Sequence, residues 1–213
     1  MPLPKKATIA PRKKPQQARS IQTVAGILEA AVRVLKRDGV DQFTTVRVAE
    51  EAGVSVGSLY QYFPNREALL FRLQAAGWRT TVGYVQEILK SPRITPLERV
   101  RAAVLTVFRT DEEEGDVRAA LGEAGALARD SPQAKAQYDR GQVQAVAFLK
   151  EALPDLDGAD IAFMADFMSS ALAAIAQRAT ERKLLPEEGE RWAKATADMF
   201  CLYVEAAASR NKA

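Results

Sequence analysis

The chain has 213 residues, a single cysteine and no histidine, and its formal net charge at pH 7 is +3. The lack of histidine excludes Ser-His-Asp and Cys-His nucleophile pairs, histidine general bases and histidine metal ligands. Cys201 by itself allows neither an intramolecular disulfide nor a thiolate zinc site, and no apolar run approaches the roughly 18 residues that cross a bilayer. We therefore expect a soluble cytoplasmic protein without a metal, a cofactor or a membrane segment.

The N-terminal nineteen residues carry four prolines and six Lys or Arg but no Asp or Glu. This composition predicts that residues 1–19 form a disordered basic arm, with Arg12, Lys13 and Lys14 as candidate phosphate contacts. Residues 1–75 as a whole carry twelve Lys or Arg against six Asp or Glu, while the remainder is net acidic. The asymmetry points to a polyanionic partner, although a basic run by itself is also typical of a solubilising tail.

Three short helices are predicted between residues 20 and 66. Ser20 precedes an amphipathic stripe that Gly39 ends, and Thr44 and Thr45 open a second helix that ends at Gly53. A third helix follows over residues 56–62.

Ser55 is a candidate N-cap for this third helix, and Asn65 for a fourth. The turn between the second and third helices has three to four residues and contains Gly53. This spacing is that of a helix-turn-helix motif.

The third helix is rich in small and hydroxyl-bearing residues, which suits a helix that reads the major groove of DNA. Gly57 and Ser58 allow close approach of the backbone, Val56 suits a thymine methyl group, and Tyr60 and Tyr62 suit phosphate. Thr45 and Arg66 lie at helix N-termini, where backbone N–H groups favour an anion. The alternative is a capped helical hairpin whose aromatic residues only fill gaps.

The stretch "TTVRVAEEAGVSVGSLYQYFPNREALL", residues 44–70, resembles the N-terminal signature of the tetracycline-repressor (TetR) family of bacterial regulators. The resemblance implies an all-α fold with a DNA-binding domain, residues 20–66, and a helical ligand-binding and dimerisation domain, residues 67–213. It also adds Gln61 to the recognition surface. Three departures are Tyr62 for the commonest histidine, Val56 for a frequent lysine or other polar residue, and Arg66 for the usual lysine.

The C-terminal region contains no motif of its own, and its roles follow from the resemblance. The last two helices, near residues 158–184 and 187–209, are Ala-rich and apolar on more than one face, so we expect them to form a homodimer interface. The candidate ligand-pocket residues are aromatic or acidic side chains of the middle helices: Trp78, Phe108, Glu123, Tyr138, Phe148, Phe163, Asp166 and Phe167. Each aromatic residue also fits ordinary core packing, and Asp166 also fits solvent or a partner helix.

The sequence therefore predicts a DNA-binding transcriptional regulator that is not an enzyme. We expect a repressor that binds a palindromic operator as a dimer and is released by a small apolar or amphipathic effector. Two other interpretations remain: an adapter that docks a protein through its helix-turn-helix, and an all-α enzyme without a recognisable active site.

Overall fold

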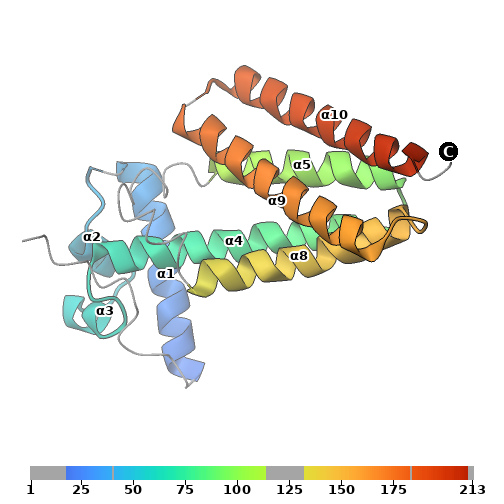
Figure 1. Cartoon of the computed structure of the whole chain (residues 1–213). Helices are drawn as coiled ribbons and strands as arrows, with labels where there is room; N and C mark the ends of the chain where they lie inside the picture. The colour runs from blue at the N-terminus through green and yellow to red at the C-terminus, as the bar shows by residue number, and fades with distance from the viewer. Residues whose placement is uncertain (1–17, 40, 114–131, 183, 211–213) are drawn as a thin grey trace, which may run out of the picture. The chain divides into compact units, whose positions relative to one another are not determined.

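The computed structural model describes residues 18–39, 41–113, 132–182 and 184–210, and the described residues are helical with no strand. The predicted all-α fold is confirmed (Figure 1). The described helices are α1 (Ala18–Asp38), α2 (Thr45–Glu51), α3 (Val56–Tyr62), α4 (Arg66–Lys90), α5 (Pro96–Glu113), α8 (Pro132–Ala152), α9 (Gly158–Glu181) and α10 (Pro186–Arg210).

The chain divides into two compact units, one comprising Met1–Gly77 and Glu114–Ala134, the other Trp78–Glu113 and Lys135–Ala213. The division falls within α4, whereas the sequence suggested a domain boundary after Arg66, at the start of that helix. Residues 1–17 of the predicted basic arm lie outside the described residues, whereas Ala18 and Arg19 belong to α1 rather than to the arm.

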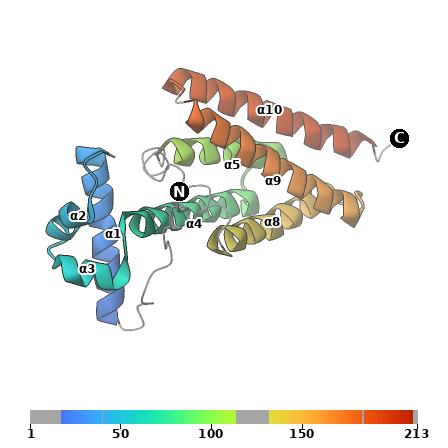
Figure 2. The ribbon, with the colours of Figure 1, turned by 60° about the vertical axis from the view of Figure 1, so that its left-hand side comes forward.

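In the first unit α2 packs against α1, and α3 packs against α2 (Figures 1 and 2). The predicted stripe of α1 faces inward, with Ile27, Ala30 and Val34 fully buried. Phe43 and Leu59 are also at most 1% exposed. Burial of such side chains is worth about 1.5–3 kcal/mol each, which stabilises helices that are individually too short.

The turn between α2 and α3 is held by local hydrogen bonds. Gly53 has a φ of +66°, a conformation that costs glycine no steric strain. The N–H groups of Gly53 and Val54 donate to the carbonyls of Glu50 and Ala49, at 3.1 and 3.0 Å, which satisfies the end of α2. Ser55 then caps α3, since its Oγ accepts from the Ser58 N–H at 3.0 Å.

The other predicted stops and caps are also present. Gly39 ends α1 with a φ of +73°, and Asn65 Oδ1 accepts from the Ala68 N–H at 2.7 Å at the start of α4. The helices α5, α8 and α10 begin at Pro96, Pro132 and Pro186, because proline is favoured at the first position of a helix.

The second unit is built on α5, α9 and α10, which pack on one another, while α8 runs alongside the segment of α4 that belongs to this unit (Figures 1 and 2). Its core includes Phe148, Ile161, Met164 and Phe200. The single cysteine, Cys201, is buried there, with Sγ directed at the Leu97 carbonyl, and burial raises the pKa of this thiol.

Arg99 joins three helices of the second unit although its side chain is buried. Its guanidinium donates to the carbonyls of Ile94 and Leu89, at 3.2 and 3.1 Å, and pairs with Glu151 at 2.9 Å. It also lies 5.8 Å from the ring centroid of Phe148. The C-terminal ends of α4 and α8 and the start of α5 are therefore linked through one charged group whose buried nitrogens have partners.

Helix α9 is apolar enough to differ from the expectation that no segment of the chain could cross a bilayer. Within it, an 18-residue window with a mean hydropathy of 1.5 meets the length and composition of a membrane-spanning helix, although only 22% of that window is buried. One such helix is weak evidence for a membrane span. The exposed side chains include Phe163 and Phe167, while Asp166 lies between them, so the apolar character belongs to a face that also carries charge.

Candidate nucleic-acid interface

Helix α3 buries one side and presents the other to solvent. Leu59 is fully buried, whereas Gly57 and Gln61 are exposed and Tyr60 is 39% exposed. The remaining sequence-predicted contacts on this helix are half-buried: Val56, Ser58 and Tyr62. The outer side of the helix therefore carries a glycine without a side chain, hydroxyl groups, the amide of Gln61 and the methyl groups of Val56. Groups of these kinds contact base edges and phosphates in protein–DNA complexes.

The fold does not require the glycine at position 57. A Cβ added to Gly57 would meet only Ser55 Oγ, at 3.9 Å, which is ordinary van der Waals contact, and its backbone is helical. Glycine within a helix costs roughly 1 kcal/mol relative to alanine. The position therefore carries a residue that destabilises α3 without any packing reason inside the chain.

Ser58 is positioned by the cap of its own helix. Its hydroxyl lies 2.8 Å from Ser55 Oγ, and its backbone N–H donates to the same oxygen. One hydrogen-bonding direction of the Ser58 hydroxyl is thus occupied within the first turn of α3, and the rotamer is constrained before any partner arrives.

Thr45 occupies a different environment from the one that the sequence suggested. Thr44, and not Thr45, caps α2, since its side chain accepts from the Arg47 N–H at 3.2 Å. Thr45 is only 8% exposed, and its Oγ1 lies 3.0 Å from the hydroxyl of Tyr60 on α3. A buried hydroxyl paired with a neighbour is less accessible to phosphate than the sequence position implied.

Arg66, at the start of α4, takes part in the packing of the first unit. Its Nε donates to the Phe43 carbonyl at 3.0 Å, and its guanidinium carbon lies 5.9 Å from the Phe43 ring centroid. Lysine lacks the planar fork that makes both contacts together. The replacement of the family's usual lysine therefore has a structural consequence that the sequence did not reveal.

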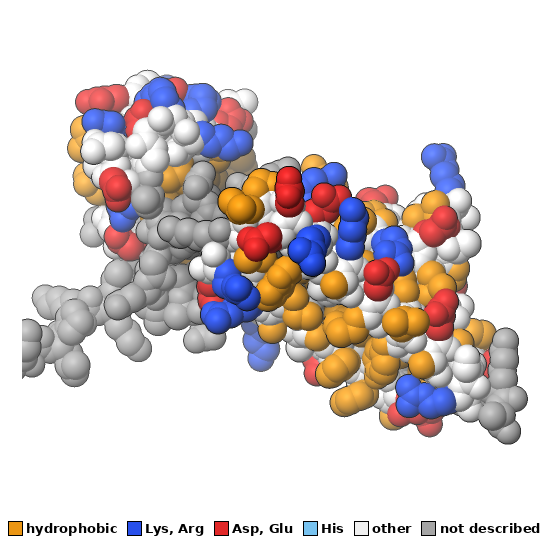
Figure 3. Space-filling view, turned by 90° about the horizontal axis from the view of Figure 1, so that it is seen from above, with side chains coloured by type: hydrophobic (Ala, Val, Ile, Leu, Met, Phe, Trp, Pro, Cys, Tyr) orange, Lys and Arg blue, Asp and Glu red, His pale blue; other side chains and the backbone are white. Residues whose placement is uncertain are grey.

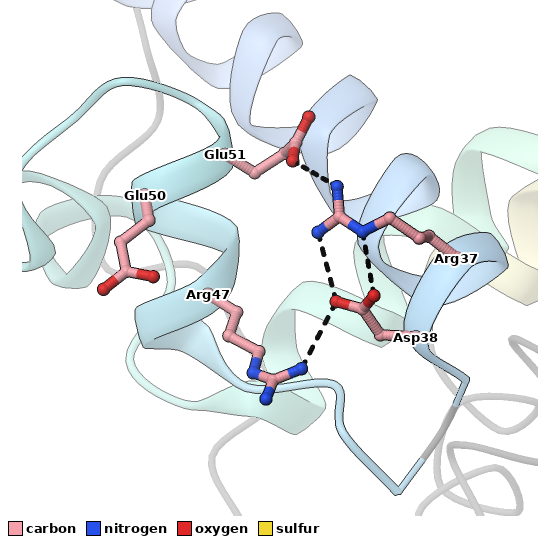
Figure 4. Close-up of a pocket in the computed structure, with 5 residues that line it drawn as sticks. All are labelled: Arg37, Asp38, Arg47, Glu50 and Glu51. Atoms are coloured by element: carbon pink, nitrogen blue, oxygen red, sulfur yellow. Dashed lines mark hydrogen bonds and ion pairs between the residues drawn. The ribbon is translucent and has the colours of Figure 1, made fainter.

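An ion-pair network that sequence reasoning missed ties α1 to α2 (Figure 4). Glu51 of α2 accepts from Arg33 at 2.8 Å and from Arg37 at 2.7 Å. Arg37 also pairs with Asp38 at 2.8 Å, and Asp38 accepts from Arg47 at 3.4 Å. Without Arg33, the members of this network line a hollow walled by charged groups, and Glu50 completes its lining. Its signal in the sequence is the i, i+4 spacing of the two arginines on α1.

The network shifts the ionisation of its members. Hydrogen bonds from Arg33 and then Arg37 lower the pKa of the Glu51 carboxyl, and a hydrogen bond from Arg37 lowers that of Asp38. The same contacts raise the pKa of Arg37, Asp38 contributing most. Both carboxylates are thus held ionised, and they fix the arginines of α1 against α2, the helix that precedes α3.

The candidate ligand-pocket residues that the structure describes lie in different environments. Phe108 and Phe148 belong to the core of the second unit, whereas Phe163 and Phe167 are 63% and 51% exposed. Tyr138 does approach Asp166, donating to its carboxylate at 2.6 Å. Trp78 is half-buried, and Glu123, like Arg12, Lys13 and Lys14, lies outside the described residues.

The fold and this surface place the chain among helix-turn-helix proteins. Residues 27–73 match the family described as bacterial regulatory proteins, tetR family, and residues 95–206 match the tetracyclin repressor-like C-terminal domain. The second match alone covers more than half of the chain. The chain therefore belongs to the TetR family of bacterial regulators, as the sequence resemblance indicated.

Among curated relatives, the chain is similar to the nucleoid occlusion factor SlmA of Actinobacillus pleuropneumoniae serotype 5b (strain L20). The two are 32% identical over 110 residues, which is 50% of this chain and 46% of that protein. The chain thus spans about half the length of the curated relative that it matches.

Two solved structures share the fold. The fatty acid degradation regulator FadR from Bacillus halodurans has a TM-score of 0.61 at 16% identity, covering 89% of this chain and 96% of that one. SmeT, the repressor of the Stenotrophomonas maltophilia multidrug efflux pump SmeDEF, has a TM-score of 0.59 at 21% identity, covering 84% and 89%. At such identities the likeness concerns the fold.

Replacing Glu51 by Gln is expected to destabilise the first unit at neutral pH and to have less effect in acid. A lowered carboxyl pKa stabilises the fold above the ordinary pKa of glutamate, and that contribution disappears as pH falls through the lowered value. The midpoint of thermal unfolding by circular dichroism should be lower for Glu51→Gln than for wild type at pH 7, and the two should converge towards pH 3. Glu50→Gln is the matched control, because Glu50 lines the same hollow without an ion pair to another described residue. An equal fall of the unfolding midpoint in Glu51→Gln and Glu50→Gln would contradict a stabilising role for the ion pairs of Glu51.

Proposed function

We propose that the chain is a transcriptional repressor that binds a palindromic DNA operator as a homodimer and is released by a small apolar or amphipathic effector. In this proposal residues 20–66 read the operator, the basic arm of residues 1–19 adds phosphate contacts, and residues 67–213 bind the effector and the partner subunit. The protein acts in the cytoplasm and has no catalytic role. Support comes from its family, whose members regulate transcription.

The exposed glycine at position 57 is the observation that best supports DNA binding. It is exposed on α3, the fold gains nothing from it, and it weakens the helix. A bare backbone position is useful where another molecule approaches the helix closely, as DNA does when a recognition helix enters the major groove. The nearby Ser58, Tyr60 and Gln61 carry groups that can form hydrogen bonds with DNA bound at this side of α3.

Gly57→Ala should therefore stabilise the protein and weaken DNA binding at once. The stabilisation should be roughly 0.5–1 kcal/mol, as for glycine to alanine in a helix, while the added methyl obstructs the groove and lowers affinity about tenfold. Unfolding in urea measures the first, and fluorescence anisotropy with a duplex selected from a random library by the wild-type protein measures the second.

Gly141→Ala is the control, because Gly141 lies in α8 with open space around its Cβ position. It should stabilise the chain similarly and leave DNA affinity unchanged. If Gly57→Ala binds the selected duplex as tightly as wild type, α3 does not approach DNA as proposed. An adapter that docks a protein would show no selection of a duplex at all.

An apolar face on α9 and α10 supports the homodimer. Figure 3 shows hydrophobic side chains gathered over these helices, and the exposed ones include Phe163, Phe167, Met199 and Leu202. Phe167 stacks with Phe163 and meets Tyr203 edge-on, with centroids 6.1 and 5.7 Å apart, so the face is preordered. Contiguous apolar surface of this kind is typical of a protein interface.

Leu202→Arg is expected to convert the dimer to a monomer and to weaken operator binding steeply. Leu202 is 64% exposed in the single chain, and a guanidinium buried there without a partner would oppose association. Val143→Arg is a matched control, since Val143 on α8 is 65% exposed. Sedimentation equilibrium should give a dimer for wild type and Val143→Arg, and a monomer for Leu202→Arg. A Leu202→Arg variant that remains dimeric excludes this interface.

The effector part of the proposal rests on the family match of residues 95–206 and on the likeness to SmeT, for which a complex with triclosan has been solved. An effector can release the operator only through a higher affinity for a state that binds DNA poorly. The interior of the second unit is mainly apolar, which favours an apolar or amphipathic molecule.

Triclosan and palmitic acid are the probes that test this part. A probe that binds the chain should raise its unfolding temperature and, by linkage, lower its affinity for the selected duplex by about 5–150-fold. Isothermal titration with and without the duplex measures the coupling. Binding of a probe with unchanged duplex affinity contradicts release by that class of molecule.

A further inference from the structure

The hydroxyls of Thr45 and Tyr60 form a pair that nothing in the local sequence anticipates. They are fifteen positions apart in the chain, on α2 and α3, and their oxygens lie 3.0 Å apart. Thr45 is 8% exposed and Tyr60 39% exposed. Thr45 is therefore almost completely buried within the first unit, whereas Tyr60 reaches its surface.

A count of hydrogens limits what this pair can offer to DNA. Each hydroxyl has one hydrogen, and one of the two is used between the oxygens. Phosphate oxygens only accept, so the pair as a whole supplies one donor to phosphate rather than two. Since Tyr60 is the exposed member, the arrangement suited to DNA has Thr45 donating to Tyr60 and Tyr60 donating outward, and the first bond strengthens the second.

We infer that Thr45 is a positioning residue for Tyr60 and makes no phosphate contact through its side-chain hydroxyl. The bond ties the N-terminal turn of α2 to the exposed side of the seven-residue α3. It holds the tyrosine ring where its hydroxyl meets the DNA backbone, so it also holds the register of the reading helix. This inference rests on the proposed DNA binding, and it names the group that orients one of its contacts.

A double-mutant cycle tests the inference, because the two hydroxyls can be removed with little change of shape. Thr45→Val keeps the branched side chain, and Tyr60→Phe keeps the ring. On the selected duplex, Tyr60→Phe should weaken binding about tenfold, as loss of a hydrogen bond to a charged group does. Thr45→Val should weaken it about threefold to fivefold in the wild-type background. In the Tyr60→Phe background it should weaken binding less than about twofold, since nothing remains to be positioned.

Two further measurements test whether the Thr45 hydroxyl itself is responsible and whether it is coupled to that of Tyr60. Thr45→Ser retains the hydroxyl and should bind within about twofold of wild type. In thermal unfolding, each single removal should lower the midpoint, and the double variant should recover part of the loss, because removing both partners leaves no buried hydroxyl unsatisfied. This second cycle needs no DNA.

The results separate the two proposals. A wild-type protein that selects no duplex removes the proposed function, whereas the unfolding cycle still reports whether the pair is coupled. Equal losses from Thr45→Val in both backgrounds would overturn the inference, since they would assign Thr45 an independent contact with DNA. Additive unfolding changes would also overturn it.

Discussion

The two central helices of the first unit have seven residues each, and isolated helices shorter than about 12–15 residues are marginal in water. Both therefore depend on tertiary packing, α2 against α1 and α3 against α2. Val48 and Ala49 of α2 and Leu59 of α3 are fully buried, and Phe63 closes the end of α3 at 1% exposure. The position of the reading helix follows from this packing and from the tight turn at Gly53, and every contact proposed for α3 depends on it.

Helix α3 meets two demands with few residues. Its inward side must hold the helix in place, and in the proposed function its outward side must remain available to DNA. Leu59 serves the first demand, whereas Gly57 weakens the helix for the second. Residues outside α3 offset this weakness: the cap at Ser55, the bond from Thr45, and the ion pairs that fix α1 to α2. Functional sites commonly break a local preference that the surrounding structure compensates.

The second unit differs, because it has more apolar surface than one chain covers. Its core is closed around Phe148, Met164 and Phe200, and Arg99 links α4, α5 and α8 with its buried nitrogens paired. The exposed aromatic residues of α9 lie beyond that core. The proposed homodimer would cover the apolar surface that makes α9 resemble a membrane span by composition.

Local features of both units were predictable from the sequence alone. The stops at Gly39 and Gly53, the caps at Ser55 and Asn65, and the proline-marked helix starts depend on atoms a few residues apart, so the residue types are sufficient. The spacing of these signals also determined the helix-turn-helix and, with the motif, the family.

Tertiary structure decided which side chains meet across the fold. The pairs Thr45–Tyr60, Arg33–Glu51 and Arg66–Phe43 are fifteen to twenty-three positions apart, and no local pattern specifies them. It also decided that Phe148 is core while Phe163 is exposed. The physical reason is that a phenylalanine suits a core and an interface equally, and its burial depends on which other helix covers it, which only the folded chain determines.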